Sequence, residues 1–169
     1  MLISMTQTIH FVRHGEVHNP EKILYGQQPG WRLSDRGQEM AKVIGQWSSN
    51  LNLGAIHASP LQRAQETAAP IIAKHNLPLT TDNNLIEAAN IFEGKKFELG
   101  NGILRHPKSW RYLWNPWRPS WGEPYDQLIS RMLKALFTAR DSAAGKDAIC
   151  VSHQLPIWTL RSAIEGRSL

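Results

Sequence analysis

The chain has 169 residues, of which 41% are hydrophobic and 20% charged, a composition that predicts one globular domain with a sizeable core and argues against disorder. Its net charge of +5 comes from scattered Lys and Arg rather than a dense basic run, so a small anionic ligand is expected and nucleic acid is not. There is no apolar run of the roughly 20 residues that span a membrane, and no signal-peptide pattern. The single cysteine, Cys150, excludes an internal disulfide and is expected to be a small buried hydrophobe, in a cytoplasmic protein.

The N-terminal part is predicted to contain a strand, a polar loop and a helix. Residues 9–12 are typical of a short buried strand, and Gly15 permits a sharp turn just behind it. Residues 33–50 predict a helix with Ser34 as its N-cap. The apolar side chains of this helix repeat at helical spacing and are expected to face the core: Met40, Val43, Ile44 and Trp47.

The rest of the chain alternates strand and helix patterns, which predicts an α/β fold with a largely parallel sheet covered on both faces. The first helix of this part has Pro60 in its first turn, and Pro70 is expected to kink or break it. A later helix carries an apolar stripe of Leu128, Ile129, Met132, Leu133, Leu136 and Phe137. The predicted strands are 55–59, 77–82 (at a sheet edge) and 148–152, and the helices are 60–76, 125–141 and a segment after His153.

Residues 101–125 are predicted to form an irregular, Trp-rich excursion near the substrate side. Their prolines and the lack of clean periodicity argue against a core helix. Three interpretations stay open: a satellite core, an oligomer surface that would make a homodimer, or the wall of a substrate lid. The tryptophans concerned are Trp110, Trp114, Trp117 and Trp121.

Polar side chains gather where three predicted strands end. Arg13 and His14 follow the first strand, Ser59 and Arg63 follow the second, and His153 follows the last. In a parallel sheet these ends lie at one edge, where ligand crevices form. Two arginines and two histidines in one small volume would repel one another unless an anion lay among them. Phosphate suits such a site, since guanidinium groups bind its oxygens in pairs.

Four sequence blocks resemble the histidine phosphatase superfamily, also called the phosphoglycerate-mutase-like family. The blocks are RHGE from residue 13, SPLQRAQET from residue 59, a downstream E…FEG and a late SH. The similarity runs from Thr8 to about Gly166 and places the blocks in the family's order. It implies a three-layer αβα sandwich with a largely parallel central sheet, over one domain that spans 1–169. The C-terminus of this domain is either truncated or naturally short.

The resemblance also implies residue roles. His14 would be the nucleophile that forms a phosphohistidine, while Arg13, Arg63 and His153 would hold the phosphoryl oxygens. Glu87 matches the acid that protonates the leaving oxygen and then serves as base for water. The cationic pocket would replace a metal, so neither a metal nor a cofactor is expected.

Several further positions are candidates for the site or alternatives to the residues above. Asn19 matches a position that lines the phosphate or substrate pocket, and the backbone amide of Gln154 would point at phosphate. Glu93 and Glu16 are the alternatives to Glu87 as the acid. His10, His14 and His18 are spaced by four residues, but a strand followed by a turn does not bring them together as metal ligands.

The resemblance favours a phosphomonoesterase of the histidine acid phosphatase type, acting on a small phosphorylated substrate. One alternative is a cofactor-dependent phosphoglycerate mutase, for which the span from Glu87 to His153 looks short. A second is a phosphohistidine-bearing or phospho-ligand-binding module, which would not need the acid. The chain departs from the family in having Gln154 and Leu155 where glycines are common, and GEP from Gly122 in place of GES.

Overall fold

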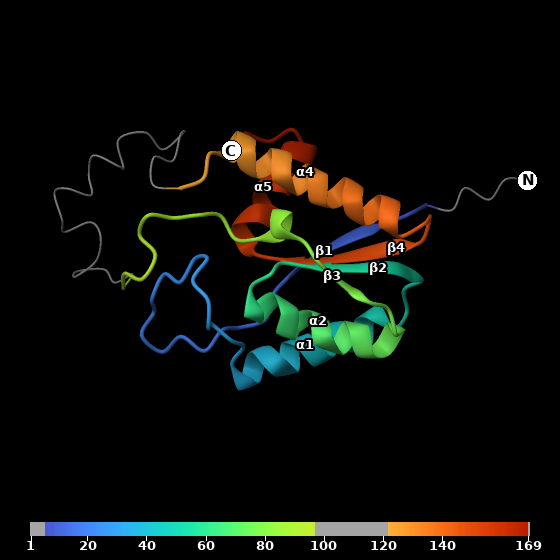
Figure 1. The fold of residues 1–169 in the computed structure, drawn as a ribbon, viewed down its shortest axis with the longest axis horizontal. Helices are drawn as coiled ribbons and strands as arrows, with labels where there is room; N and C mark the ends of the chain where they lie inside the picture. Colours follow the sequence, from blue (N-terminus) through green and yellow to red (C-terminus); the bar gives the residue numbers. More distant parts are fainter. Residues whose placement is uncertain (1–5, 97–121, 169) are drawn as a thin grey trace, which may run out of the picture.

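The computed structural model describes residues 6–96 and 122–168. Four parallel strands form a sheet of order β1-β4-β2-β3, with α1 and α2 on one face and α4 and α5 on the other (Figure 1). This arrangement confirms the expected three-layer αβα sandwich. The Trp-rich excursion lies almost wholly outside the described residues. The elements are β1 (Ile9–Arg13), α1 (Asp35–Ser48), β2 (Leu53–Ala58), α2 (Gln62–His75), β3 (Leu79–Thr81), the 3-10 turn η1 (Asn83–Leu85), α4 (Tyr125–Ser142), β4 (Asp147–Ser152) and α5 (Gln154–Ile164).

The register of the strands brings their carboxyl ends to one edge of the sheet. Val151 of β4 pairs with Val12 of β1 on one side and with Ala58 of β2 on the other. Along β4, Ile149 and Val151 pack in the core that faces α2, while the alternate residues pack in the core that faces α4. Because β4 is buried on both faces, it fixes the positions from which the polar loops leave the sheet.

The two edges of the described sheet are formed by β1 and β3. The edge position expected for 77–82 is confirmed, since β3 pairs with β2 alone among the described strands. The first strand was expected to be buried, but β1 also lies at an edge of the described sheet and its residues are half-buried or exposed. The buried strand next to it is β4, which contains the fully buried Cys150, as expected.

The prediction for the face of α1 is wrong for three of its four residues. Met40, Val43 and Trp47 are 45%, 61% and 42% exposed, whereas Ile44 is half-buried and packs against the core, as predicted. The buried residues of this helix are small: Gly37, Ala41, Gly45 and Ser48. The physical reason is that α1 packs closely on α2, so that a Cβ on Gly45 would lie 2.7 Å from the Cβ of Pro70. A contact this close selects small side chains and leaves the larger ones outside.

The other helices follow the predictions more closely. Ser34 caps α1 by accepting a hydrogen bond from the amide of Gly37 (3.0 Å). α2 begins at Gln62 with Leu61 as its N-cap, so Pro60 lies before the helix rather than in its first turn, and the break expected at Pro70 does not occur. On α4, Leu128 and Met132 of the stripe are buried and its other aliphatic residues are half-buried. Phe137 is exposed beneath the Arg140 guanidinium.

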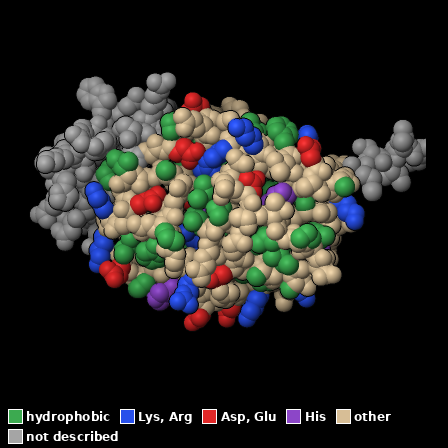
Figure 2. Space-filling model, viewed as in Figure 1, with side chains coloured by type: hydrophobic (Ala, Val, Ile, Leu, Met, Phe, Trp, Pro, Cys, Tyr) green, Lys and Arg blue, Asp and Glu red, His purple; other side chains and the backbone are tan. Residues whose placement is uncertain are grey.

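Charge is distributed over the surface as the composition suggested. In the space-filling view, acidic and basic side chains are interspersed on the visible face (Figure 2). Among the described helices, none combines the length and the hydrophobicity needed to cross a membrane.

Candidate active site

Three strand ends bring the predicted phosphate ligands together. His14 directly follows β1, His153 is the N-cap of α5 behind β4, and Arg63 lies in the first turn of α2. The rings of His14 and His153 contact each other in an edge-on arrangement, with centroids 5.0 Å apart. The side chains are strongly buried, at 5% exposure for His14, 1% for Arg63 and 0% for His153. The structure therefore gathers these three residues, while Arg13, at the end of β1, stays exposed.

The hydrogen bond of His14 determines which ring nitrogen is free. Its Nδ1 lies 2.7 Å from the carbonyl oxygen of Gly15, which can only accept. Nδ1 therefore carries the hydrogen, and Nε2 keeps its lone pair. The backbone is held in place as well, because the amide of His14 donates to the Ser152 carbonyl (3.0 Å). The ring thus has the tautomer that a nucleophilic imidazole needs.

A single hydroxyl links the turn after His14 to the helix that carries Arg63. Thr67 Oγ1 accepts from the amide of Gly15 (3.0 Å) and donates to the carbonyl of Arg63 (2.7 Å). Gly15 has no room for a side chain, since a Cβ there would lie 2.6 Å from the carbonyl oxygen of Gly37. The turn is therefore fixed from two sides.

Arg63 is a buried cation with an unused donor. Its Nη2 donates to the carbonyl of Gly26 (2.7 Å), and its guanidinium lies over the Tyr25 ring, 4.7 Å from the centroid. Tyr25 in turn stacks on Trp31 at 5.1 Å. Nε of Arg63 is buried and has no hydrogen-bond partner among the described residues. A buried guanidinium in this state is well suited to bind an anion.

His153 shows the same incomplete bonding. Its Nε2 lies 2.8 Å from Ser59 Oγ, at the end of β2, while its Nδ1 is buried and has no hydrogen-bond partner among the described residues. Ser59 is fully buried and is thus a positioning residue for this ring. One ring nitrogen is held, and the other is available to a ligand.

Burial keeps both histidines neutral. It lowers the pKa of His14 to about 4, with further lowering from the positive charges of Arg63 and Arg13, although the bond to Gly15 opposes the shift. The pKa of His153 is also lowered, first by burial and then by Arg63 and His14. At neutral pH the His14 ring is therefore unprotonated, as nucleophilic attack requires.

Glu87 lies beyond η1 on the other side of the site. Its Oε1 accepts from the amide of Ala88 (2.9 Å), and its backbone carbonyl accepts from Gln27 Nε2 (2.6 Å). Burial raises the pKa of Glu87 above its ordinary value, against the opposing positive charges of Arg63, Arg131 and Arg13. The raised pKa favours a protonated carboxyl group that can act as an acid.

The two alternatives to Glu87 are engaged in holding turns. Glu93 Oε1 accepts from the amide of Asn90 (3.2 Å). Glu16 accepts from Ser34 Oγ (2.8 Å) and has the Arg36 guanidinium 3.8 Å away. Glu87 also accepts from a backbone amide, but it lines the larger pocket and burial raises its pKa, so it remains the better candidate for the acid, although this role stays a prediction.

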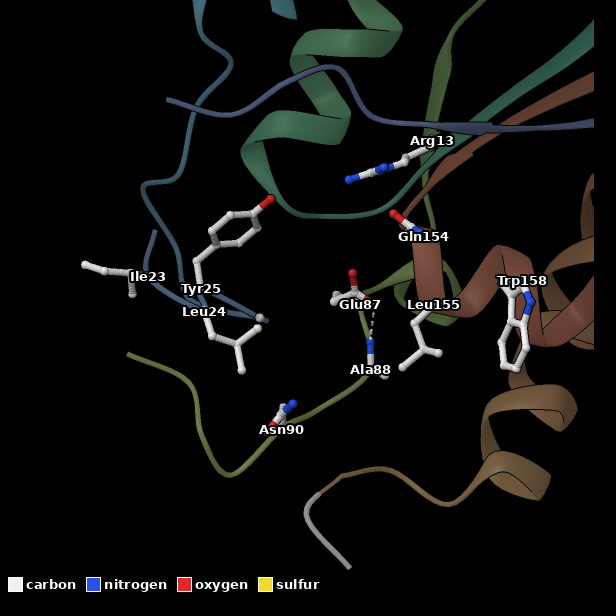
Figure 3. Close-up of a pocket in the computed structure, with 11 residues that line it drawn as sticks. Arg13, Ile23, Leu24, Tyr25, Glu87, Ala88, Asn90, Gln154, Leu155 and Trp158 are labelled. Carbon is white, nitrogen blue, oxygen red and sulfur yellow. Dashed lines mark hydrogen bonds between the residues drawn. The ribbon is translucent and has the colours of Figure 1, made fainter. Parts of the chain in front are cut away.

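Two hollows meet at Arg13 and Tyr25. The smaller, of about 440 Å³, is lined by His14 and also by Glu16 and Asn19. The larger, of about 530 Å³, is lined by Glu87 and Gln154 (Figure 3). Both sequence-predicted substrate residues therefore border the site, in different hollows.

Asn19 also stabilises its own loop. Its amide group donates to the carbonyl of Ile23 (2.8 Å), and its carbonyl oxygen accepts from the amide of the same residue (2.9 Å). These bonds close the loop that leads to Tyr25. Asn19 thus shapes the wall of the site through its own loop.

The histidines spaced by four residues do not meet. His10 packs edge-on against Trp47 at 5.3 Å, and its Nε2 lies 3.9 Å from Asp147. His14 faces His153 instead. Within the described parts of the chain, no group of three or more His, Cys, Asp or Glu side chains is arranged as metal ligands.

Sequence reasoning missed several supporting residues. Tyr25 stood in a polar loop without a periodic pattern, and Thr67 had only its place after Arg63 as a signal. Arg131 was also missed: it forms a two-pronged ion pair with Glu123 (2.7 and 2.8 Å) and donates to the carbonyl of Asn84 (2.6 Å). The bond to Asn84 links α4 to η1, just before Glu87.

The chain belongs to the histidine phosphatase superfamily (branch 1), whose family model matches residues 9–169. This confirms the family that the four sequence blocks indicated.

Two relatives illustrate the range of the family. Rv0525, an uncharacterized protein of Mycobacterium tuberculosis, is 52% identical over 161 residues, covering 95% of this chain and 80% of that protein. GpmB, a probable phosphoglycerate mutase of Salmonella choleraesuis, is 27% identical over 164 residues, covering 94% of this chain and 74% of that protein.

Solved structures share the fold. YhfR of Bacillus stearothermophilus matches with a TM-score of 0.81 and 27% identity, over 96% of this chain and 81% of that one. A putative alpha-ribazole-5'-P phosphatase of Escherichia coli matches with a TM-score of 0.77 and 21% identity, over 96% of this chain and 81% of that one. At that identity the second likeness shows the fold alone.

The lowered pKa of His14 predicts a loss of stability in acid. An unfolded chain protonates this histidine near pH 6.5, whereas the folded protein does so only near pH 4. The contribution of His14 to the free energy of unfolding is therefore fully present above pH 6.5. It decreases as the pH falls, by about 3 kcal/mol at pH 4. Urea unfolding across this range should show His14→Asn gaining stability relative to the wild type as the pH falls. A constant difference between the two proteins would contradict the assignment.

Proposed function

We propose that the protein is a metal-independent phosphatase that hydrolyses a small phosphomonoester through a phosphohistidine on His14. The observation that carries the proposal is the free Nε2 of a neutral, buried His14 beside the unused donor of Arg63 and the unused ring nitrogen of His153. A nucleophile and ligands for the phosphoryl oxygens thus occupy one small volume.

The first step transfers the phosphoryl group to the enzyme. Nε2 of His14 forms a bond to phosphorus as the bond from phosphorus to the ester oxygen breaks. Glu87, in its protonated form, gives its proton to the departing oxygen, so an alcohol leaves. Arg13, Arg63 and His153 bind the phosphoryl oxygens and stabilise the charge that develops on them.

The second step returns the enzyme to its starting state. The Glu87 carboxylate takes a proton from water as the water oxygen attacks phosphorus, and the bond to His14 Nε2 breaks. Inorganic phosphate leaves, Glu87 is again protonated and His14 again neutral. Similarity to a probable phosphoglycerate mutase favours a second candidate function, that of a mutase. In a mutase, another hydroxyl group of the bound alcohol, in place of water, would take the phosphoryl group from His14.

The test separates anion binding from chemistry. Inorganic phosphate and vanadate should inhibit competitively, and activity should survive EDTA. Arg63→Ala should weaken vanadate binding by about 100-fold or more, because a buried guanidinium is lost from the phosphoryl site. Arg140→Ala, on an exposed arginine of α4 that pairs with Asp141, is the matched control and should bind vanadate normally. Loss of activity in EDTA with recovery on adding a metal would refute the metal-free mechanism.

A further inference from the structure

The larger hollow lies on the side of the site from which the alcohol would leave. Glu87 projects into it, and Arg13 borders it at the end of the sheet (Figure 3). An acid must lie within hydrogen-bond reach of the oxygen that it protonates. The carbon framework attached to that oxygen therefore has to extend into this hollow. Its volume of about 530 Å³ is in the range of small-molecule pockets.

The walls of this hollow are mostly apolar. Ile23 and Leu24 come from the loop that Asn19 closes, and Tyr25 presents its ring beside them. Leu155 and Trp158 project from α5 on the opposite side (Figure 3). Apolar groups on two facing walls would enclose an apolar ligand.

The two side chains of α5 are exposed although they are large and apolar. Leu155 is 37% exposed and Trp158 46%, whereas Pro156, Thr159 and Leu160 of the same helix are buried. A spacing of three residues places Leu155 and Trp158 on one face of the helix. A ligand that covers this face removes apolar surface from water, which favours binding in proportion to the area covered.

The charged side chains of this hollow already have assigned roles. Among the described residues that line it, only Arg13 and Glu87 are charged. Arg13 is assigned to the phosphoryl group and Glu87 to proton transfer. The other polar groups of this lining are the Tyr25 hydroxyl and the Asn90 and Gln154 amides, which are neutral and can each orient one polar group. A carboxylate on the leaving alcohol would find no cation of its own among these residues.

We propose that the preferred substrates are phosphomonoesters of uncharged alcohols with an apolar or aromatic carbon framework, which packs between Leu24 and Tyr25 on one side and Leu155 and Trp158 on the other. This inference rests on the proposed phosphatase function. It assigns the leaving-group site to the larger hollow and separates it from the phosphoryl site around His14.

A chain-length series tests the proposal. The value of kcat/KM should rise about two- to fourfold for each methylene group from ethyl to hexyl phosphate, since each group adds buried apolar surface. 3-Phenylpropyl phosphate should exceed glycerol 3-phosphate and 3-phosphoglycerate by about 10-fold or more. Values that are independent of chain length, or a preference for the carboxylated ester, would overturn the proposal.

Variants locate the effect. Leu155→Ala and Trp158→Ala should each reduce the rise per methylene, and both are expected to fold because the side chains are partly exposed. Ile164→Ala is the matched control, since Ile164 is on the same helix, 63% exposed and not part of this lining. It should keep the wild-type slope. A slope equal to the wild type in both cavity variants would also overturn the proposal.

Acetyl phosphate distinguishes this failure from failure of the proposed function. It is a small phosphoryl donor whose leaving group needs little help from an acid or from apolar contacts. Labelling of the wild type by acetyl phosphate together with a flat chain-length series would reject the substrate class and keep the phosphatase. No labelling and no turnover of any ester would reject both.

Discussion

Replacing His14 by Ala is expected to reduce phosphatase activity by about 10³-fold or more, because the covalent route through Nε2 is lost. The fold should survive, since the backbone amide that pairs with Ser152 is unchanged. Rapid-quench labelling with a radioactive phosphomonoester should give acid-labile, base-stable phosphate on the wild type and none on the variant.

His18 provides the control for this experiment. It is exposed and lies in the same loop, so His18→Ala should leave both labelling and turnover near the wild-type level. Near-normal turnover by His14→Ala would remove His14 from the nucleophile role.

Replacing Glu87 by Gln should produce a loss that depends on the leaving group. Gln keeps the shape of the side chain but cannot supply a proton. An alkoxide needs that proton in order to leave, so phosphorylation by an alkyl phosphate should slow by about 10²–10⁴-fold. A nitrophenolate leaves readily without it, and we expect a loss of about 10-fold or less with nitrophenyl phosphate.

Single-turnover formation of the phosphoenzyme is the proper measurement, because the second step also needs Glu87 as a base. Glu93→Gln is the matched control and should show no dependence on the leaving group, since Glu93 accepts a hydrogen bond from the Asn90 amide. Equal losses for alkyl and aryl esters in Glu87→Gln would assign the acid elsewhere.

The cluster at the sheet edge could be anticipated because strand ends are readable from the sequence. The apolar runs that end at Arg13, Ser59 and Ser152 become β1, β2 and β4, and parallel pairing then brings His14 and His153 together. No contact between distant side chains was needed for that inference.

The failures came from contacts that the local sequence does not display. The face of α1 was assigned from periodicity, but its partner turned out to be α2, and the close approach at Gly45 and Pro70 selected the small residues instead. Tyr25 matters because the Arg63 guanidinium lies over its ring, while the Gly26 carbonyl, 37 residues from Arg63 in the sequence, accepts from that guanidinium. Thr67 matters because it accepts from the Gly15 amide, 52 residues away. Such pairings depend on the path of the loops, which periodicity cannot predict.

The edge position of β1 has a consequence for how the protein is made. β1 pairs with β4 alone among the described strands. Residues 9–13 therefore cannot join the sheet until residues 147–152 have been synthesised. During synthesis, His14 therefore stays without its Ser152 and His153 neighbours until residue 153 has emerged. Pairing of strands so distant in sequence is slow, because a long loop must close before any contact stabilises it. The ribosome-bound chain thus acquires its anion site only after β4 has been made, and phosphate can stabilise only a chain that has completed the β1–β4 pair.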